Sequence, residues 1–169
     1  MAERVHHTLP VWIDPAARVL ILGTMPSPRS RERGMYYGHP QNRFWPTLAK
    51  LWQESVPKTP EEARDFARRH HIALWDVLAE CDIEGASDSS IRDARPNDVA
   101  ALLVRYPNLR HIATTGNKAR DLYKRHLLPQ TGLEATSLPS TSAANRSHWP
   151  DDKLVDAYKV LFTLLEDRP

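Results

Sequence analysis

The sequence predicts an α/β fold: a three-layer α/β/α sandwich built on a short, mostly parallel four-stranded sheet. Three observations carry this prediction. Short apolar runs recur along the chain, helical patterns with recognisable start signals separate them, and strand precedes helix each time. A chain of 169 residues has the length of about one domain. We therefore expect residues 1–169 to form a single domain.

The first predicted strand is RVLILG at residues 18–23, an apolar run that ends in glycine. Continuous apolar runs of this length are typical of strands buried on both faces of a parallel sheet. Residues 71–78 and 109–116 show the same pattern, and residues 133–140 form a weaker fourth candidate. These four segments are the expected sheet.

Helical segments lie between the predicted strands. Thr59, Pro60 and Glu62 have the spacing of a capping box with proline at the first helical position. Asn97 or Asp98 is expected to cap a later helix. Another helix is expected to open at Gly116–Asn117. An apolar stripe typical of one C-terminal helix comprises Leu154, Tyr158, Leu161, Phe162 and Leu165.

Composition excludes several classes of protein. Cys81 is the single cysteine, so an intramolecular disulfide or a thiolate-rich metal site is impossible. The chain has no leader-like apolar segment and no apolar run of membrane-spanning length, so we expect a cytoplasmic protein without membrane contact. The glycine fingerprints of dinucleotide and ATP sites are missing, as is the serine-hydrolase elbow. No cofactor is expected.

Histidines do not change that expectation. The chain contains eight, but the pairs at 6–7 and 70–71 consist of neighbours whose side chains diverge on regular structure. We therefore expect these four histidines to be solvated and predict no metal site.

Polar residues follow each predicted strand at the point where it ends. In open parallel sheets, ligands bind beyond the carboxyl ends of the strands, where loops and helix N-termini converge. The candidate ligand site therefore comprises residues 24–27, Asp76, residues 115–117 and residues 139–142.

An aromatic segment, GMYYGHPQNRFWP at residues 34–46, hangs from the first of these strand ends. Phe44, Leu48 and Trp52 are four residues apart, which favours the core face of a helix over ligand contacts. For Tyr37, stacking on a ligand and packing in the core remain equal alternatives.

Two further features of this region each have two interpretations. Asn42 has the position of an ordinary helix cap, and position alone does not make it a catalyst. The net charge is +2, and Arg29, Arg31, Arg33 and Arg43 form a local basic excess. These arginines either contact phosphates or belong to a solvated loop.

Three motifs in this order carry a family resemblance: GTMPS at 23–27, YYGHPQNRFW at 36–45 and LPSTSAANR at 138–146. Together they resemble the uracil-DNA glycosylase superfamily, and most closely its hypoxanthine-DNA glycosylase (DNA-deoxyinosine glycosylase) branch. The resemblance spans roughly residues 18–165 and includes the segment at 74–91. Each motif alone is weak, and the signal lies in their order and spacing.

The resemblance implies roles for individual residues. Tyr37 falls where the superfamily places an aromatic that stacks on the extruded base. Met25 replaces the water-orienting asparagine of the mismatch-specific branch, and the hypoxanthine branch relies instead on an asparagine that corresponds to Asn42. Further residues implied at the substrate are Gly23, Met25, Pro26, Ser27, His39 and Asp76. His39 is expected to be more structural than acid–base, and Asp76 either bonds a base edge or caps the following turn. Those implied at DNA are Arg43, which either approaches a phosphate or braces the loop, and Ser140, Thr141, Ser142, Asn145 and Arg146.

The resemblance thus predicts a monofunctional DNA glycosylase for deaminated bases, hypoxanthine first, with uracil and xanthine as further candidates. It would flip the base out of the helix and use water to break the N-glycosidic bond. One alternative is a mismatch-specific uracil/thymine glycosylase, against which Met25 argues. The other is a catalytically silent damage-binding module. The expected partner is damaged DNA, and the expected state is a nucleoid-associated monomer.

Overall fold

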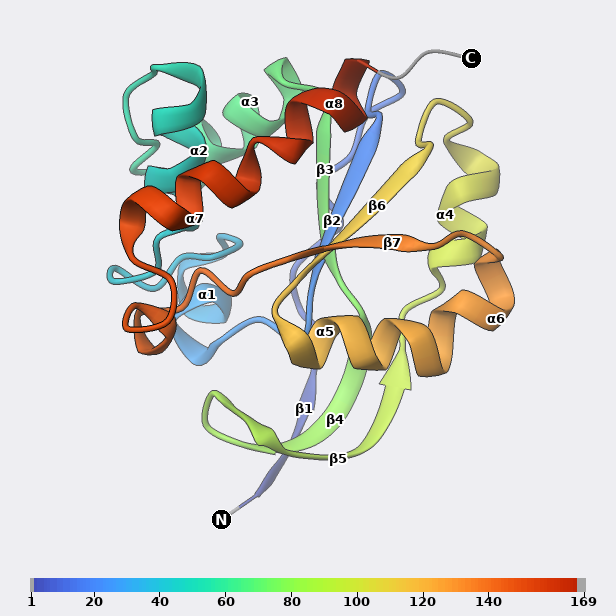
Figure 1. Ribbon diagram of the computed structural model, residues 1–169. Helices are drawn as coiled ribbons and strands as arrows, with labels where there is room; N and C mark the ends of the chain where they lie inside the picture. The colour runs from blue at the N-terminus through green and yellow to red at the C-terminus, as the bar shows by residue number, and fades with distance from the viewer. Residues whose placement is uncertain (1, 167–169) are drawn as a thin grey trace.

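The parallel sheet forms as predicted in the computed structural model, which describes residues 2–166 (Figure 1). Its strands are β2 (Val19–Gly23), β3 (Ile72–Asp76), β6 (His111–Thr115) and β7 (Ala135–Leu138), in the order β3-β2-β6-β7. All three pairings are parallel. The four predicted strands are therefore confirmed.

The central strand β2 is buried on both faces because a helical or hairpin layer covers each side of the sheet. Side chains alternate along a strand, so Val19 and Ile21 enter one core while Leu20 and Leu22 enter the other, and all four are fully buried. Four helices supply the first core: α2 (Phe44–Trp52), α3 (Pro60–Arg69), α7 (Asp151–Tyr158) and α8 (Val160–Glu166).

The opposite face is covered by α4 (Val99–Arg105), by α5 (Asn117–Leu122) and by the helical segments that continue it. A π-helical turn at Tyr123–Leu127 joins α5 to α6 (Leu128–Thr131), so the three segments form one continuous, bent helix along this face (Figure 1). The layers confirm the three-layer α/β/α sandwich.

A second sheet was not predicted. It contains β1 (Glu3–His6), β4 (Leu78–Glu84) and β5 (Ser87–Pro96), paired antiparallel in the order β1-β4-β5. The expected single strand at 71–78 in fact ends at Asp76, and its last residue begins β4. β5 gave no strand signal because it is rich in serine and charge, and bulges interrupt its register with β4.

Helix starts follow the expected signals with local changes. Thr59 Oγ1 accepts a hydrogen bond from Glu62 N at 3.1 Å, but the Glu62 carboxylate accepts from Lys58 N rather than from Thr59. Asp98, not Asn97, caps α4 by accepting from Ala101 N at 3.0 Å.

The C-terminal stripe is divided between two helices, α7 and α8, instead of one. The expected core face of α2 is confirmed for Phe44 and Leu48, which are fully buried, while Trp52 is half-buried against Phe66. Cys81 is a buried free thiol, and burial raises its pKa.

Candidate functional site

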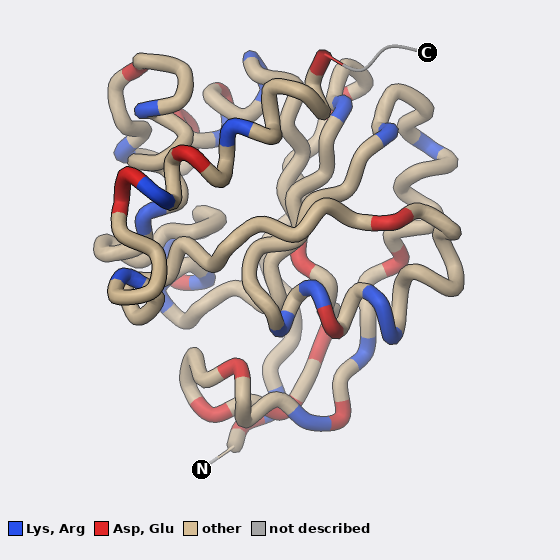
Figure 2. The backbone as a smooth tube through the Cα atoms, in the orientation of Figure 1, with Lys and Arg blue, Asp and Glu red and all other residues tan. Residues whose placement is uncertain are grey.

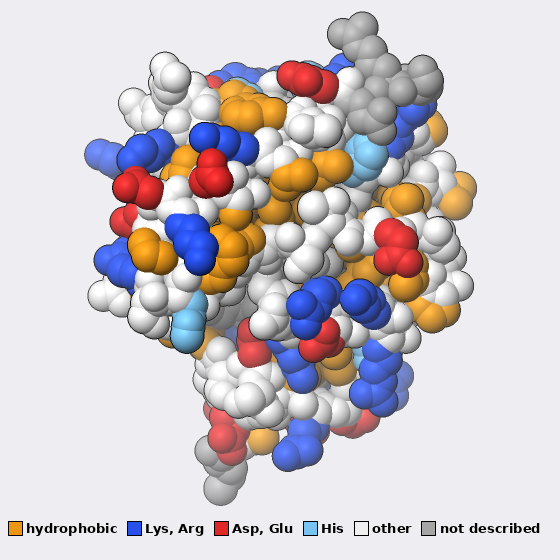
Figure 3. All heavy atoms as spheres, viewed as in Figure 1, with side chains coloured by type: hydrophobic (Ala, Val, Ile, Leu, Met, Phe, Trp, Pro, Cys, Tyr) orange, Lys and Arg blue, Asp and Glu red, His pale blue; other side chains and the backbone are white. Residues whose placement is uncertain are grey.

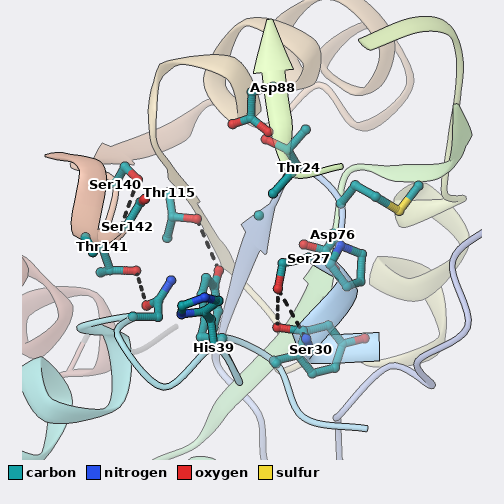
Figure 4. Close-up of a pocket in the computed structure, with 18 of the residues that line it drawn as sticks. Thr24, Ser27, Ser30, His39, Asp76, Asp88, Thr115, Ser140, Thr141 and Ser142 are labelled. Atoms are coloured by element: carbon teal, nitrogen blue, oxygen red, sulfur yellow. Dashed lines mark hydrogen bonds between the residues drawn. The ribbon is translucent and has the colours of Figure 1, made fainter. Parts of the chain in front are cut away.

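A cavity of about 390 Å³ lies at the carboxyl ends of β2, β3 and β6 (Figure 4). Strands β3 and β6 lie on opposite sides of β2, so the chain reverses its direction of winding at this point. Such switch points are where open α/β sheets bind ligands. The cavity is lined by residues of all three sequence motifs, including Gly23, Met25, Pro26, Ser27, Tyr37, His39, Asn42, Asp76, Ser140, Thr141 and Ser142.

Three oxygen atoms converge over Gly23 at the floor of this cavity. A Cβ atom placed on Gly23 would lie 2.6 Å from Asp76 Oδ1, 3.3 Å from the Tyr37 hydroxyl and 3.6 Å from Thr115 Oγ1. Only glycine leaves this space open, because the first of these distances is shorter than real Cβ contacts. The floor is therefore polar, and it has no room for a side chain at position 23.

Asp76 is held rigidly at the end of β3. Its side chain is 6% exposed, and Oδ2 shares a hydrogen bond with His7 Nε2 at 2.9 Å. Asn97 Nδ2 donates to the carbonyl of Asp76 at 2.9 Å and to that of Leu78 at 3.1 Å, which fixes the strand end. The pKa of Asp76 is raised, because burial raises it by more than the hydrogen bond and charge of His7 lower it.

The contact with His7 corrects the expectation that the paired histidines are solvated. The His7 side chain is only 4% exposed, whereas that of His6 is 69% exposed and meets Glu80. No local signal distinguishes the two neighbours, because His7 is buried by residues about seventy positions away in the chain.

Asp88 is a second carboxylate at the cavity that sequence reasoning missed. It lies at the start of β5, and Figure 4 shows it beside Thr24 at the cavity wall. Asp88 is exposed to solvent at this wall. Partial desolvation of its carboxyl group and the charge of Asp76 raise its pKa, while the charge of Lys118 lowers it. Because the β4–β5 hairpin was not predicted, nothing in the sequence placed this side chain near the strand ends.

Tyr37 forms one wall of the cavity. Helix α1 (Pro28–Arg33) ends at Gly34, and the following turn gives Tyr37 a left-handed backbone with φ 55°. Its ring stacks on Phe44 at 3.9 Å, and its hydroxyl is 3.1 Å from Thr115 Oγ1. Burial raises its pKa. Tyr37 is thus a packed wall with one ring face covered, not a free aromatic at the rim.

Asn42 is oriented by two hydrogen bonds to its side-chain oxygen. Oδ1 accepts from Phe44 N at 2.9 Å and from Thr141 Oγ1 at 2.8 Å. The backbone N–H of Phe44 can only donate, so it determines which end of the amide carries the oxygen. Nδ2 has no hydrogen-bond partner among residues 2–166, and it remains available to a ligand. Asn42 therefore serves the start of α2 and lines the cavity at once.

Arg43 is 4% exposed beneath the loop that follows β7, which favours the bracing alternative. Its guanidinium donates to the carbonyls of Trp149 and Ser142 and pairs with Asp151 at 3.2 Å. Its backbone N–H donates to the Thr141 carbonyl at 3.0 Å. The second and third motifs are thereby joined.

The loop at 139–146 is ordered by its own polar groups. Asn145 Nδ2 donates to the Ser140 carbonyl at 3.0 Å, within a short 3₁₀ turn at Ala143–Asn145. Arg146 remains 61% exposed with Asp151 3.8 Å away, so it retains the reach to a phosphate.

Two arginines of the expected basic patch, Arg33 and Arg43, bond to other parts of the protein. Arg33 donates to the carbonyls of Gly38 and Lys58 at 2.6 and 3.0 Å, and Arg43 is buried. Figures 2 and 3 show Lys and Arg spread over the viewed face with Asp and Glu among them. A single dense basic stripe is absent from this view.

The remaining predicted substrate residues line the cavity with structural duties of their own. Ser27 caps α1 by accepting from Ser30 N at 3.2 Å. His39 is exposed, and its Nδ1 accepts from Gln41 N at 3.1 Å. Met25 packs against the second core.

Metal-binding and membrane features were sought in the part of the chain that the structure describes. Residues 2–166 contain no grouping of His, Cys, Asp and Glu that could hold a metal ion. Within the same range, no helix is both long and apolar enough to span a membrane.

The fold and cavity define a class: an α/β protein with a polar recess at a switch point and an oriented amide in its wall. Comparison with known proteins identifies the family. Residues 10–163 match the model of the uracil DNA glycosylase superfamily, and the chain belongs to that superfamily.

Two similar curated proteins are hypoxanthine DNA glycosylases of Methanosarcina. The one from M. acetivorans is 37% identical over 138 residues, which cover 81% of this chain and 86% of the relative. The one from M. barkeri is 34% identical over the same coverage. A solution NMR structure of a candidate uracil DNA glycosylase from M. acetivorans has a TM-score of 0.78 at 33% identity, covering 94% of this chain and 98% of that one.

Proposed function

We propose that this protein is a monofunctional DNA glycosylase that removes deaminated bases, with hypoxanthine as its first substrate. Membership of the superfamily and identity to two hypoxanthine DNA glycosylases support the activity and the substrate class. The observation that carries the proposal is the polar recess over Gly23, in which Asp76, Tyr37 and Thr115 converge. A base flipped out of the helix would be read there through its hydrogen-bonding edge.

The oriented amide of Asn42 limits how it would assist water. Both hydrogen bonds to Oδ1 come from the protein, so the free Nδ2 would donate to the oxygen of the attacking water. An amide N–H positions water but accepts no proton, so Asn42 would act by placement. The water oxygen bonds the anomeric carbon, the glycosidic bond breaks with its electron pair on the base, and the surplus proton passes to solvent.

Positive charge develops on the sugar during this reaction, as in glycoside hydrolysis. Asp88 lines the cavity, and a carboxylate near the developing cation would stabilise it. None of the residues lining the described cavity is a lysine, which supports a hydrolytic reaction without a lyase step. The expectation of a cytoplasmic, nucleoid-associated monomer belongs to the same proposal.

The test is base release from duplexes that carry one inosine, xanthine, uracil or G·T mispair. Strand cleavage is measured with and without alkali. Release of hypoxanthine, with cleavage only after alkali, is the expected result. Preferred release of uracil or mispaired thymine would instead support the mismatch-specific alternative, and tight binding without release would support a damage-binding module.

A further inference from the structure

An N-terminal residue, His7, contacts the carboxylate at the floor of the cavity. His7 follows β1 and lies before residues 10–163, the part of the chain that matches the family. Its backbone N–H donates to the Ala79 carbonyl at 2.7 Å, which brings the segment against the β3–β4 junction. Its ring packs between Tyr36, with ring centroids 6.1 Å apart, and the edge of Trp75, with ring centroids 6.5 Å apart.

The two oxygens of Asp76 have different surroundings. Oδ2 is 2.9 Å from His7 Nε2. Oδ1 is the oxygen that approaches the space over Gly23, where a Cβ atom would meet it at 2.6 Å. The carboxylate is therefore anchored through one oxygen and presents the other to the cavity floor.

An ionised carboxylate accepts hydrogen bonds and donates none. Deamination converts the ring nitrogen of adenine or cytosine that only accepts, N1 or N3, into an N–H that donates. An ionised Asp76 would bind this N–H and repel the lone pair of the undamaged base. A protonated Asp76 would donate, which would reverse the preference. Such discrimination by one buried polar group is strong because the wrong partner leaves it unpaired.

Burial opposes ionisation of Asp76, and His7 counteracts burial. The other titratable groups that face Asp76 are Tyr36, Tyr37 and Asp88. Two are neutral phenols and the third is a carboxyl group, so none of them favours the charged form. Among the described residues around the carboxylate, His7 alone does so.

We propose that His7 is a positioning residue that keeps Asp76 a hydrogen-bond acceptor and thereby favours hypoxanthine and uracil over adenine and cytosine. This inference rests on the proposed function, in which Asp76 reads the base edge. It assigns to the N-terminal segment a role in substrate selection.

The experiment compares His7→Ala, His7→Gln and the neighbouring control His6→Ala. Single-turnover release of hypoxanthine is measured from about pH 5 to about pH 9. Removal of His7 raises the pKa of Asp76, so the acid limb of the His7→Ala profile should move to higher pH. Each unit of that shift lowers the rate on the limb about tenfold, and the rate should recover in alkali. His7→Gln keeps a donor and should restore part of the rate, while His6→Ala should match the wild type.

A parallel NMR titration of the Asp76 carboxyl carbon in the wild type and His7→Ala needs no substrate. An unshifted profile or titration in folded His7→Ala would overturn the inference, as would an equal loss of rate at every pH. If the wild type released no base from any duplex, the proposed function would fail. The NMR titration would still test whether His7 lowers the pKa of Asp76. Retention of the wild-type Asp76 pKa in His7→Ala would then refute it.

Discussion

Replacement of Asn42 by alanine and by aspartate separates its structural role from its chemical one. Alanine removes the oxygen that accepts from Phe44 N at 2.9 Å and from Thr141 Oγ1 at 2.8 Å. Each hydrogen bond contributes about 0.5–1.5 kcal/mol, so Asn42→Ala should lower the free energy of unfolding by about 1–3 kcal/mol. Aspartate keeps an acceptor for both donors and removes only the Nδ2 donor. Asn42→Asp should therefore retain most of the stability.

Chemistry should respond differently to the same two changes. Both variants lose Nδ2, so both should release hypoxanthine about 100-fold more slowly, the effect of one polar donor in other active sites. Single-turnover rates are measured at saturating enzyme, so that weaker DNA binding caused by the introduced carboxylate does not lower the measured rate. Thr141→Val is the matched control, because it removes one donor to Oδ1 but leaves Nδ2. A wild-type rate for Asn42→Asp would refute the donor role, and a wild-type thermal midpoint for Asn42→Ala would refute a stabilising role of the two hydrogen bonds to Oδ1.

Three further variants test the rest of the site. Tyr37→Ala should lower the free energy of unfolding by about 2 kcal/mol, because the Tyr37 ring stacks on Phe44, whereas Tyr37→Phe should keep most of that stability. Chemical denaturation measures the difference. Equal stability of the wild type and both variants would contradict the packing. Gly23→Ala should slow base release more than it weakens binding to undamaged DNA, since its Cβ would displace Asp76 Oδ1; an unaffected rate would show that the recess is not the base site. If Arg146 contacts a phosphate, Arg146→Ala should reduce the slope of log affinity for DNA against log salt concentration by about 1. Arg33→Ala should leave that slope unchanged, because the Arg33 side chain bonds to the Gly38 carbonyl within the protein.

Strand positions and core faces were predictable because they depend on local periodicity. The four parallel strands and the core face of α2 follow from runs and spacings that burial on a sheet imposes. The antiparallel sheet was not predictable in this way. β5 is rich in serine and charge and pairs with β4 through bulges, so it lacks the alternation that identifies a strand.

The site shows the same division between local and distant causes. Motifs identified the segments that line the cavity, since each motif is contiguous in sequence. The contacts of the functional groups come partly from residues far away: Thr141 lies 99 positions from Asn42, and His7 lies 69 positions from Asp76. Sequence could therefore place an amide at position 42, but not decide whether it donates or accepts. That choice follows from the Phe44 N–H and the Thr141 hydroxyl, which together leave Asn42 only its nitrogen to offer.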